Sequence, residues 1–494
     1  MYLTKDTENE AAGKEHAVGS VCPRTGKAVP ELPFFLRCKK IYFSEISGTI
    51  IKRFMEEKTN SIVSEYFSYF VPCVLMAIAT QTASIIDKIF IGNFVNPVEM
   101  GAANACMPVT QFVFTLSVLI GVGASATISV LKGKNKTEEC NKVFGNAVFW
   151  GLVFGIALLA FLFIFSSQVL SFLLEDKSIQ KYAEAYYIIF IWMVPFRLIS
   201  AIIQNISRSD GFPKIGSAAV IISNFCNVVF NWIFMGPLKM GVRGAAFGTL
   251  ICFVVECFIN LSYFAFKKRT FRVWLKGALG KSGEVFSVGL PACIGTGLIT
   301  FKLVILNNLA AKLNGESGLV VMAVSLSCLS LASMFSAGAN NAMVPLAGKY
   351  FGAGDTESFK KVIKVSLVSL FGFTTLVVIF LELFADGFTR FHGVSDVQTL
   401  SLGIQSIRLY AVSLYGMCFT FFMIYLLPIT GKKAVSTIMS ICEGFVFIVP
   451  LCFLFSSSFG FKGIWYAFIL TELLTAAVYC IGNQIERIHR NRKA

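Results

Sequence analysis

Charged residues and histidines are scarce in this sequence of 494 residues. Only 14% of the residues are charged and 3 are histidines, whereas 55% are hydrophobic. This composition leaves too little polar surface to cover a soluble particle of that length, so it excludes a soluble protein and indicates one that lies in a bilayer. The histidines, His16, His392 and His489, fall outside the long apolar runs. Their positions argue against an intramembrane metal site or a histidine proton relay.

Paired cysteines and the short motifs of enzymes are also missing. The 14 cysteines are scattered singly, without a CxxC pair, as is typical of small buried hydrophobic side chains. The sequence contains no HExxH, GxSxG, phosphate loop or aspartate-rich pair. Its net charge of +15 comes without the basic stripe, interleaved with aromatics, that suggests nucleic acid. We therefore expect no enzymatic activity, no nucleic-acid partner and no cofactor beyond a transported ion.

Twelve apolar segments are present, each close to the roughly 20 residues that a helix needs to cross a bilayer. They begin near residues 66, 104, 143, 184, 214, 244, 287, 318, 361, 403, 434 and 461. Backbone groups cannot stay unpaired in lipid, and the segments lack the short alternating pattern of barrel strands, so each must be a helix. The sequence predicts an all-α integral membrane protein with twelve transmembrane helices.

The chain is also an internal repeat with an offset of about 220 residues. Pro72 matches Pro291 and the run GVRG at 241–244 matches GFKG at 460–463, both at an offset of 219, and Gly211 matches Gly431 at 220. Each half holds an even number of spans. The two six-helix repeats therefore share one orientation and are related by a pseudo-twofold axis along the membrane normal, as in many transporters.

Lysines and arginines concentrate in alternate loops. If the N-terminus is cytoplasmic, the inner segments hold most of them, and the outer loops hold few, chiefly Lys177, Lys181, Lys239, Arg243 and Lys462. This bias places both termini in the cytoplasm and the protein in the cell membrane. The predicted parts are a partly disordered cytoplasmic tail (1–61, amphipathic at 50–66), an N-lobe (62–266), a cytoplasmic linker (267–284), a C-lobe (285–484) and a basic cytoplasmic C-terminus (485–494).

Ionisable residues inside the spans are costly to bury and therefore point to function. They are Asp87, Lys88, Arg197, Glu256, Lys302, Arg408, Glu443 and Glu472. Asp87 lies between apolar neighbours, where burial favours the neutral carboxyl group and makes proton uptake near neutral pH feasible. The alternative is a surface pair with Lys88, but adjacent residues on a helix do not face each other.

Three asparagines follow one face of the fifth span. Asn224, Asn227 and Asn231 are spaced by three and four residues, so their amides align. Such a stripe needs partners in lipid, which leaves two interpretations open: hydrogen bonds between helices, or coordination of a ligand or ion. The glycine-rich run at 241–249 lets the sixth span approach a neighbouring helix, which Thr249 would then reach.

These motifs, in this order and repeated, resemble the MATE (multidrug and toxic compound extrusion) family. The resemblance covers about residues 62–484 and rests on DKIFIG at 87–92, GVGASATISVLKGK at 121–134, the asparagines of span 5 and the run at 241–249. LPITGKKA at 427–434 and GFKGIWYAFILTE at 460–472 look most like the branch of bacterial multidrug exporters. The resemblance implies two lobes that open alternately to each side and export organic cations in exchange for protons or sodium ions.

The resemblance also implies an ion-coupling site in the N-lobe. By motif position its residues are Asp87, Tyr186, Asn227, Asn231 and Thr249. A sodium ion would lie between Asp87 and the amides of Asn227 and Asn231, whose hard oxygen atoms suit it. A proton on Asp87 is the other interpretation.

The C-lobe departs from the branch of the family that has acidic residues in spans 7 and 10. Here span 7 carries Lys302, and span 10 has only Arg408. The candidate polar site of this lobe consists of Lys302, Glu443, Glu472 and Glu256. We favour a structural ion pair of Lys302 with Glu443 or Glu472 over contact with substrate.

The predicted function is therefore export of a small cationic or amphipathic substrate by antiport with protons or sodium ions. The expected partners are this substrate and the lipid bilayer, and a monomer suffices. The rival interpretation is a flippase for a lipid-linked sugar or another amphipathic lipid. That function needs a strongly basic cavity for pyrophosphate, whereas the spans offer only Arg197, Lys302 and Arg408.

Overall fold

The computed structural model describes residues 62–94, 97–174 and 177–493. The predicted N-terminal tail and nearly all of its amphipathic segment lie outside these residues. All the described helices belong to one compact unit, Asn60–Ala494, which contains both predicted lobes.

The described residues of the N-lobe form helices and connecting turns, with no strands. Its elements are α2 (Ile62–Phe94), α3 (Pro97–Ala105), α4 (Met107–Gly133), α5 (Thr137–Ile164), α6 (Ser166–Leu173), α7 (Lys177–Phe190), α8 (Met193–Asp210), α9 (Pro213–Met235), α10 (Val242–Leu261) and the 3₁₀ turn η1 (Ser262–Ala265). The short helices α3 and α6 lie before and after full spans and were not predicted from the sequence.

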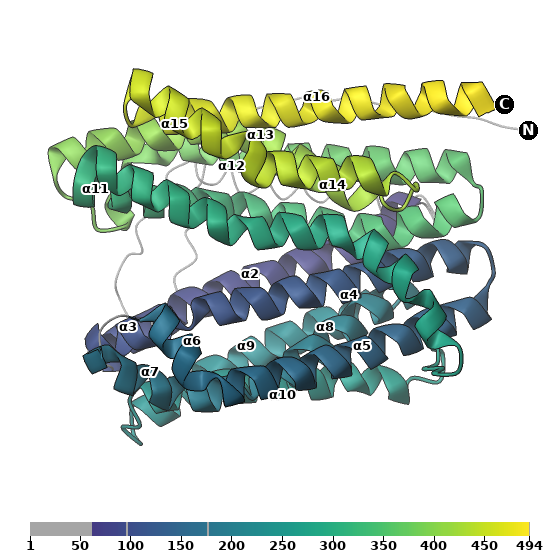
Figure 1. Ribbon diagram of the computed structural model, residues 1–494, viewed down its shortest axis with the longest axis horizontal. Coiled ribbons are helices and arrows are strands. Elements are labelled where there is room, and N and C mark those ends of the chain that lie inside the picture. Colours follow the sequence, from purple (N-terminus) through teal and green to yellow (C-terminus); the bar gives the residue numbers. More distant parts are fainter. Residues whose placement is uncertain (1–61, 95–96, 175–176, 494) are drawn as a thin grey trace, which may run out of the picture. The chain divides into compact units, whose positions relative to one another are not determined.

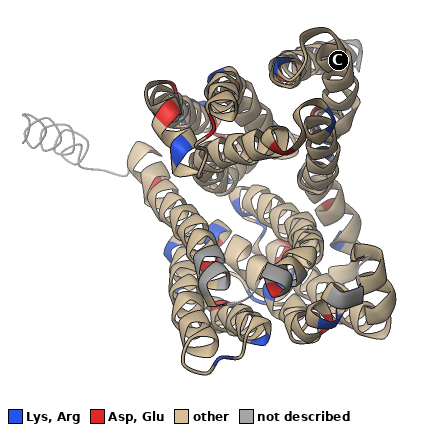
Figure 2. Ribbon diagram, turned by 90° about the vertical axis from the view of Figure 1, so that its left-hand side faces the viewer, with Lys and Arg blue, Asp and Glu red and all other residues tan. Residues whose placement is uncertain are grey.

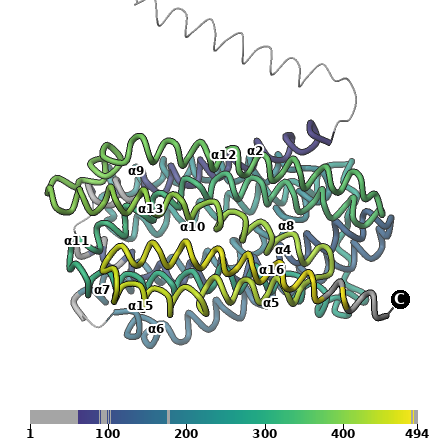
Figure 3. Tube along the Cα trace, turned by 90° about the horizontal axis from the view of Figure 1, so that it is seen from above, coloured from purple at the N-terminus to yellow at the C-terminus, as the bar shows by residue number. Residues whose placement is uncertain are grey.

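The C-lobe follows an irregular segment after η1 and is also helical. Its elements are the 3₁₀ turn η2 (Ala278–Lys281), α11 (Ser282–Gly352), α12 (Thr356–Phe391), α13 (Val397–Leu426), α14 (Lys433–Ile441), the π-helical turn η3 (Cys442–Val446), α15 (Ile448–Phe459) and α16 (Lys462–Lys493). Figure 1 shows α2 to α10 gathered on one side and α12 to α16 on the other, and Figure 3 shows the helices running side by side along one direction.

The number of spans agrees with the prediction. Ten helices among the described residues are long and apolar enough to cross a membrane, and the pair Ile179–Phe190 and Met193–Asp210, bent by 46°, makes an eleventh when it is counted as one span. Helix α11 has 71 residues and breaks at Asn314 (φ −135°) and Gly315 (φ 57°), so it supplies two spans. The all-helical architecture with twelve spans is confirmed. Charged residues are sparse along these helices (Figure 2).

The repeat is visible in the backbone itself. Gly241 (φ 58°, ψ −140°) precedes α10, and Gly460 (φ 60°, ψ −142°) takes the same conformation before α16. Residues with a Cβ atom are strongly disfavoured there, which explains why both repeats keep glycine. The paired turns at Gly211 (φ 107°) and Gly431 (φ 86°) are both left-handed as well. The sequence match therefore reflects two copies of one structural unit.

The lobes meet chiefly where α4 packs on α11. A Cβ atom at Gly123 would collide with the Val285 carbonyl, and one at Gly289 would collide with the Leu119 carbonyl, so the two backbones are in direct contact. The Arg208 guanidinium on α8 donates a hydrogen bond of 2.7 Å to the Asn341 side chain on α11. Small residues thus allow α4 to bridge the two halves.

Candidate functional site

The polar face of α9 meets α2 at Asp87. The Asn231 amide nitrogen donates a hydrogen bond of 2.6 Å to Asp87 Oδ1 and another of 3.2 Å to Asn227 Oδ1. Asn231 is fully buried and Asn227 nearly so, while Asp87 is half-buried. Three residues predicted from the sequence therefore form one connected cluster. The alternative partner Lys88 has a side chain outside the described part of the structure.

Local sequence explains how this cluster is held. Asn227 and Asn231 lie one turn apart on α9, so their side chains stack on one face. Gly248 brings α10 against that face, because a Cβ atom at this position would collide with Asn231 Oδ1. At the start of α10, the Val242 amide donates a hydrogen bond of 2.8 Å to Glu99 of α3, which anchors the helix end.

Tyr186 and Thr249 complete the cluster. The Tyr186 hydroxyl lies beside the Thr249 side chain and within electrostatic reach of Asp87. Its ring stacks on Phe190 with centroids 5.1 Å apart, which fixes its direction on α7. The five residues predicted by resemblance therefore come from α2, α7, α9 and α10 and converge on one place.

One oxygen atom of this cluster is left without a partner. Asn231 Oδ1 is buried and accepts no hydrogen bond from any described residue. Burying a hydrogen-bond acceptor without a donor costs free energy, and this cost is relieved if an ion or a proton donor binds to the atom. The carboxylate of Asp87, the amide oxygens and the Thr249 hydroxyl are hard donors that suit a sodium ion, and the carboxylate also suits a proton. Both predicted occupants fit the residues present.

Asn224 stands apart from this cluster. Its amide donates a hydrogen bond of 3.3 Å to Thr80 of α2 at an exposed position. This contact is a link between two helices, so the third asparagine of the predicted stripe serves structure rather than the site.

Glu256 does not belong to the C-lobe site in which the sequence grouped it. It lies on α10 of the N-lobe, where it accepts hydrogen bonds from Arg197 at 3.1 Å and from Ser200 at 2.9 Å. Asn260 donates to Ser200 at 2.9 Å. Sequence reasoning missed Ser200 and Asn260, although each lies one turn from a charged residue on its own helix. The grouping was wrong because Glu256 lies on the sixth span, inside the N-lobe, and its side chain packs against α8 of that same lobe.

The other C-lobe candidates are divided between two contacts. Lys302 on α11 forms an ion pair of 2.5 Å with Glu443 on η3. Glu472 on α16 instead accepts a hydrogen bond of 2.7 Å from the Thr420 hydroxyl on α13. Of the two partners predicted for Lys302, the structure therefore selects Glu443. Arg408 forms an exposed pair with Glu382 at 3.6 Å, on the surface of the helices.

A further charged network was not foreseen from the sequence. Asp210, at the end of α8, accepts hydrogen bonds from the Tyr263 hydroxyl at 2.8 Å and from the Thr270 amide at 2.7 Å. Lys132 of α4 lies 3.3 Å from the same carboxylate. This network ties α4, α8 and the segment after α10 together, so its role is structural.

Comparisons with known proteins agree with this architecture. The sequence model of the MatE family matches residues 72–233 and again 291–454, one match in each lobe. The Multidrug export protein MepA of Staphylococcus haemolyticus is 24% identical over 435 residues, which cover 86% of this chain and 95% of that protein. MepA of Staphylococcus aureus is 24% identical over 411 residues, covering 82% and 90%.

Solved structures show the same fold. A multidrug resistance MATE family transporter of the MOP superfamily, in an outward-facing conformation, superposes with a TM-score of 0.81 at 19% identity, covering 88% of this chain and 98% of that one. A MOP superfamily transporter from Pyrococcus furiosus gives a TM-score of 0.79 at 19% identity, covering 86% and 96%. With a family match over both lobes and the repeat visible in sequence and backbone, this chain belongs to the MATE family.

Proposed function

We propose that this protein is a multidrug efflux transporter that exports organic cations or amphipathic drugs across the cell membrane by antiport with protons or sodium ions. The observation that carries the proposal is the contact between Asp87 and Asn231, which joins α2 to α9 beside an unpartnered amide oxygen. The bacterial relatives named as multidrug export proteins support the direction and the substrate class.

The contact has two hydrogen-bonding modes. With Asp87 ionised, the Asn231 amide nitrogen donates to the carboxylate, as in the structure. With Asp87 protonated, its hydroxyl becomes a donor, and Asn231 Oδ1 is the adjacent buried acceptor that has no partner. A sodium ion would draw on the same oxygen atoms of Asp87, Asn227 and Asn231. Loading of the site therefore changes how α2 packs on α9 and α10, and this change couples ion entry to release of the substrate.

The rival function, a lipid-linked sugar flippase, is less well supported by the charges. Arg197 is paired with Glu256, Lys302 with Glu443, and Arg408 with Glu382. None of these basic candidates offers an unneutralised positive charge for a pyrophosphate group.

Ethidium efflux from vesicles, with proton and sodium gradients imposed separately, tests the proposal. We expect efflux under one of the gradients, and its loss in Asp87→Asn. The matched control is Glu382→Gln, which neutralises a carboxylate on the lobe surface and should leave efflux unchanged. Fully coupled efflux by Asp87→Asn, or no efflux by the folded wild-type protein under either gradient, would refute the proposal.

The orientation is part of the same proposal. We expect both termini in the cytoplasm, because the basic loops alternate with loops poor in lysine and arginine. A fluorescent protein fused after residue 494 should fluoresce in intact bacteria, while an alkaline phosphatase fused there should be inactive.

A further inference from the structure

A second buried polar cluster lies inside the C-lobe, away from the site described above. It consists of Lys302, Glu443 and Glu472, which are 6%, 1% and 4% exposed. They come from α11, η3 and α16. Three ionisable side chains in one lobe core are expensive to bury, and an ion pair alone accounts for two of them.

The charges of this cluster do not balance. Lys302 provides one positive charge and pairs with Glu443. Glu472 has the Thr420 hydroxyl as its hydrogen-bond donor, with Glu443 and Lys302 as the charged groups in electrostatic reach. The other titratable groups facing the cluster are Tyr410, Cys418 and Cys452, none of which is a cation. With both carboxyl groups ionised, the cluster would carry one unpaired buried negative charge, which the cost of removing that charge from water disfavours.

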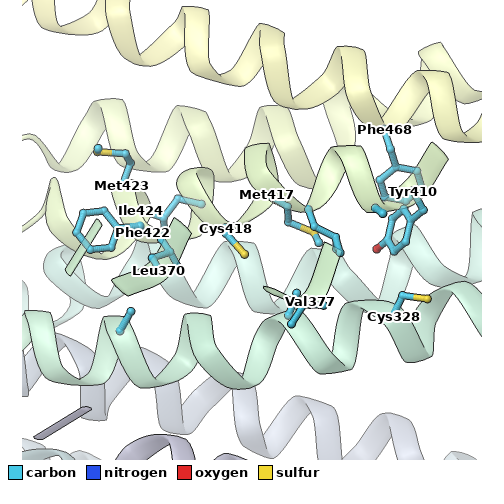
Figure 4. Close-up of a cluster of buried hydrophobic side chains, with 14 of the residues drawn as sticks. Cys328, Leu370, Val377, Tyr410, Met417, Cys418, Phe422, Met423, Ile424 and Phe468 are labelled. Carbon is cyan, nitrogen blue, oxygen red and sulfur yellow. The ribbon is translucent and has the colours of Figure 1, made fainter. Parts of the chain in front are cut away.

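The surroundings of the cluster offer little compensation. The Lys302 ammonium lies 5.7 Å from the centroid of the Phe468 ring. Phe468 in turn packs edge-on against Tyr410, with ring centroids 5.2 Å apart. Figure 4 shows these two rings next to each other. Gly416 lets α13 close against Glu472, because a Cβ atom there would meet the Glu472 side chain. The second oxygen of Glu443, Oε2, is buried and has no hydrogen-bond partner among the described residues. The cluster thus contains one acceptor without a donor, on Glu443, and one carboxyl group without a cation of its own, on Glu472.

Within the repeat, this cluster lies close to the position in the C-lobe that is equivalent to the N-lobe site. The position 219 residues before Lys302 is Ala83, one helical turn before Asp87, and the position 219 residues before Glu443 is Asn224, one turn before Asn227. Both clusters therefore join the first span of a lobe to its fifth, at levels that differ by one turn. Their charges differ: the N-lobe has a carboxylate on its first span and neutral amides on its fifth, whereas the C-lobe has the cation on its first span and the carboxylate on its fifth. Glu443 also lies on a π-helical turn, a distortion that is frequent at functional sites.

We propose that Lys302, Glu443 and Glu472 form a proton-binding site in which two carboxyl groups share one ammonium partner and one proton. The proton resides on Glu472 while Lys302 pairs with Glu443. Its release leaves one net negative charge, which the closed core does not tolerate, so release must accompany a movement of η3 or α16 that admits water. The role of this site in transport rests on the proposed antiport, whereas proton binding itself does not.

Sodium fits this cluster less well than a proton. A sodium ion needs several oxygen ligands, but Lys302 is already paired with Glu443, and the Phe468 ring lies 5.7 Å from the Lys302 ammonium. Among the described residues, no group of three His, Cys, Asp or Glu side chains is placed to hold a metal ion.

Infrared difference spectroscopy of the purified transporter tests the proposal, through the C=O stretching band of protonated carboxyl groups. We expect Glu472→Gln to lose the intensity of one carboxyl group relative to the wild type. Glu443→Gln should lose the same intensity, because Glu472 then ionises as the new partner of Lys302. Thr420→Val is the matched control, since it removes a hydrogen bond without changing the charge count and should keep the band.

These outcomes differ from those of a purely structural ion pair. A full band in Glu443→Gln, an unchanged band in Glu472→Gln, or loss of the wild-type band on adding sodium would each overturn the proposal. The Glu472→Gln and Thr420→Val variants leave the Lys302 pair intact, so at least these should fold. The spectra require no transport, so failed efflux with the expected spectra would reject the antiporter and keep the proton site. Efflux by the wild type, together with carboxyl bands that Glu472→Gln and Glu443→Gln leave unchanged, would keep the antiporter and reject the proton site.

Discussion

Arg197 and Glu256 form an ion pair of 3.1 Å in which the two partners differ in exposure. The Arg197 side chain is 22% exposed and the Glu256 side chain 3%. The guanidinium is therefore partly open to its surroundings, while the buried carboxylate accepts its hydrogen bonds from Arg197 and Ser200. Replacing Arg197 and replacing Glu256 should therefore reduce the stability of the protein by different amounts.

We expect Arg197→Met to destabilise the protein by about 3 kcal/mol, because it leaves a buried carboxylate without a cation. Glu256→Gln should cost less, since the partly exposed guanidinium can turn outward. To compare the two variants, each is heated in detergent, and the temperature at which half of the monodisperse protein is lost is measured. A double variant, Arg197→Met with Glu256→Gln, should recover most of the loss. Equal effects of the two single variants would contradict this account.

The paired glycines of the repeat should also respond unequally to alanine. At Gly241 and Gly460 the conformation itself costs a residue with a Cβ atom about 1–3 kcal/mol. At Gly241 the added Cβ would also lie 2.8 Å from a Glu99 carboxylate oxygen, whereas at Gly460 it would meet nothing within 4 Å. Gly241→Ala should therefore lower the unfolding temperature more than Gly460→Ala. Equal lowering in the two variants would show that the Glu99 contact relaxes freely, and the reverse order would contradict this account.

Asn231 should matter for ion coupling more than Asn224 does. A hydrogen bond to a carboxylate contributes roughly 1.5–3 kcal/mol, so we expect Asn231→Leu to reduce gradient-driven ethidium efflux about tenfold or more. Asn224→Leu removes only the exposed bond to Thr80 and is the matched control, with efflux near the wild-type rate. Equal losses in the two variants would mean that the asparagine stripe serves packing alone.

The N-terminus of α13 provides a pH-dependent contribution to stability. Asp396 accepts hydrogen bonds from the Thr399 amide and the Thr399 hydroxyl, both at 2.8 Å. These bonds hold the pKa of Asp396 below its usual value. The stabilisation is therefore present above the unfolded pKa of about 3.9 and is lost as the pH falls through the lower folded pKa. We expect Asp396→Ala to lower the unfolding temperature at pH 7, and the difference from the wild type to shrink below pH 4. A difference that is independent of pH would assign the effect to something other than the charged cap.

The N-lobe site was largely within reach of the sequence. Asn227 and Asn231 share a face because of their spacing, and the family resemblance supplied Asp87, Tyr186 and Thr249. The structure brings these residues together on α2, α7, α9 and α10. What no spacing could indicate was the unpartnered oxygen of Asn231, because it depends on how closely α10 approaches at Gly248.

The sequence by itself determined the membrane class, the twelve spans and the twofold repeat. Each follows from a property that reads along the chain: about twenty apolar residues per span, and glycines and prolines that return after 219 residues. Only the tertiary structure decided which charges meet. Glu256 pairs with Arg197 and Lys302 pairs with Glu443, whereas Glu472 accepts a hydrogen bond from Thr420. These choices depend on the rotation and packing of helices far apart in sequence, and the period of a single helix does not contain that information.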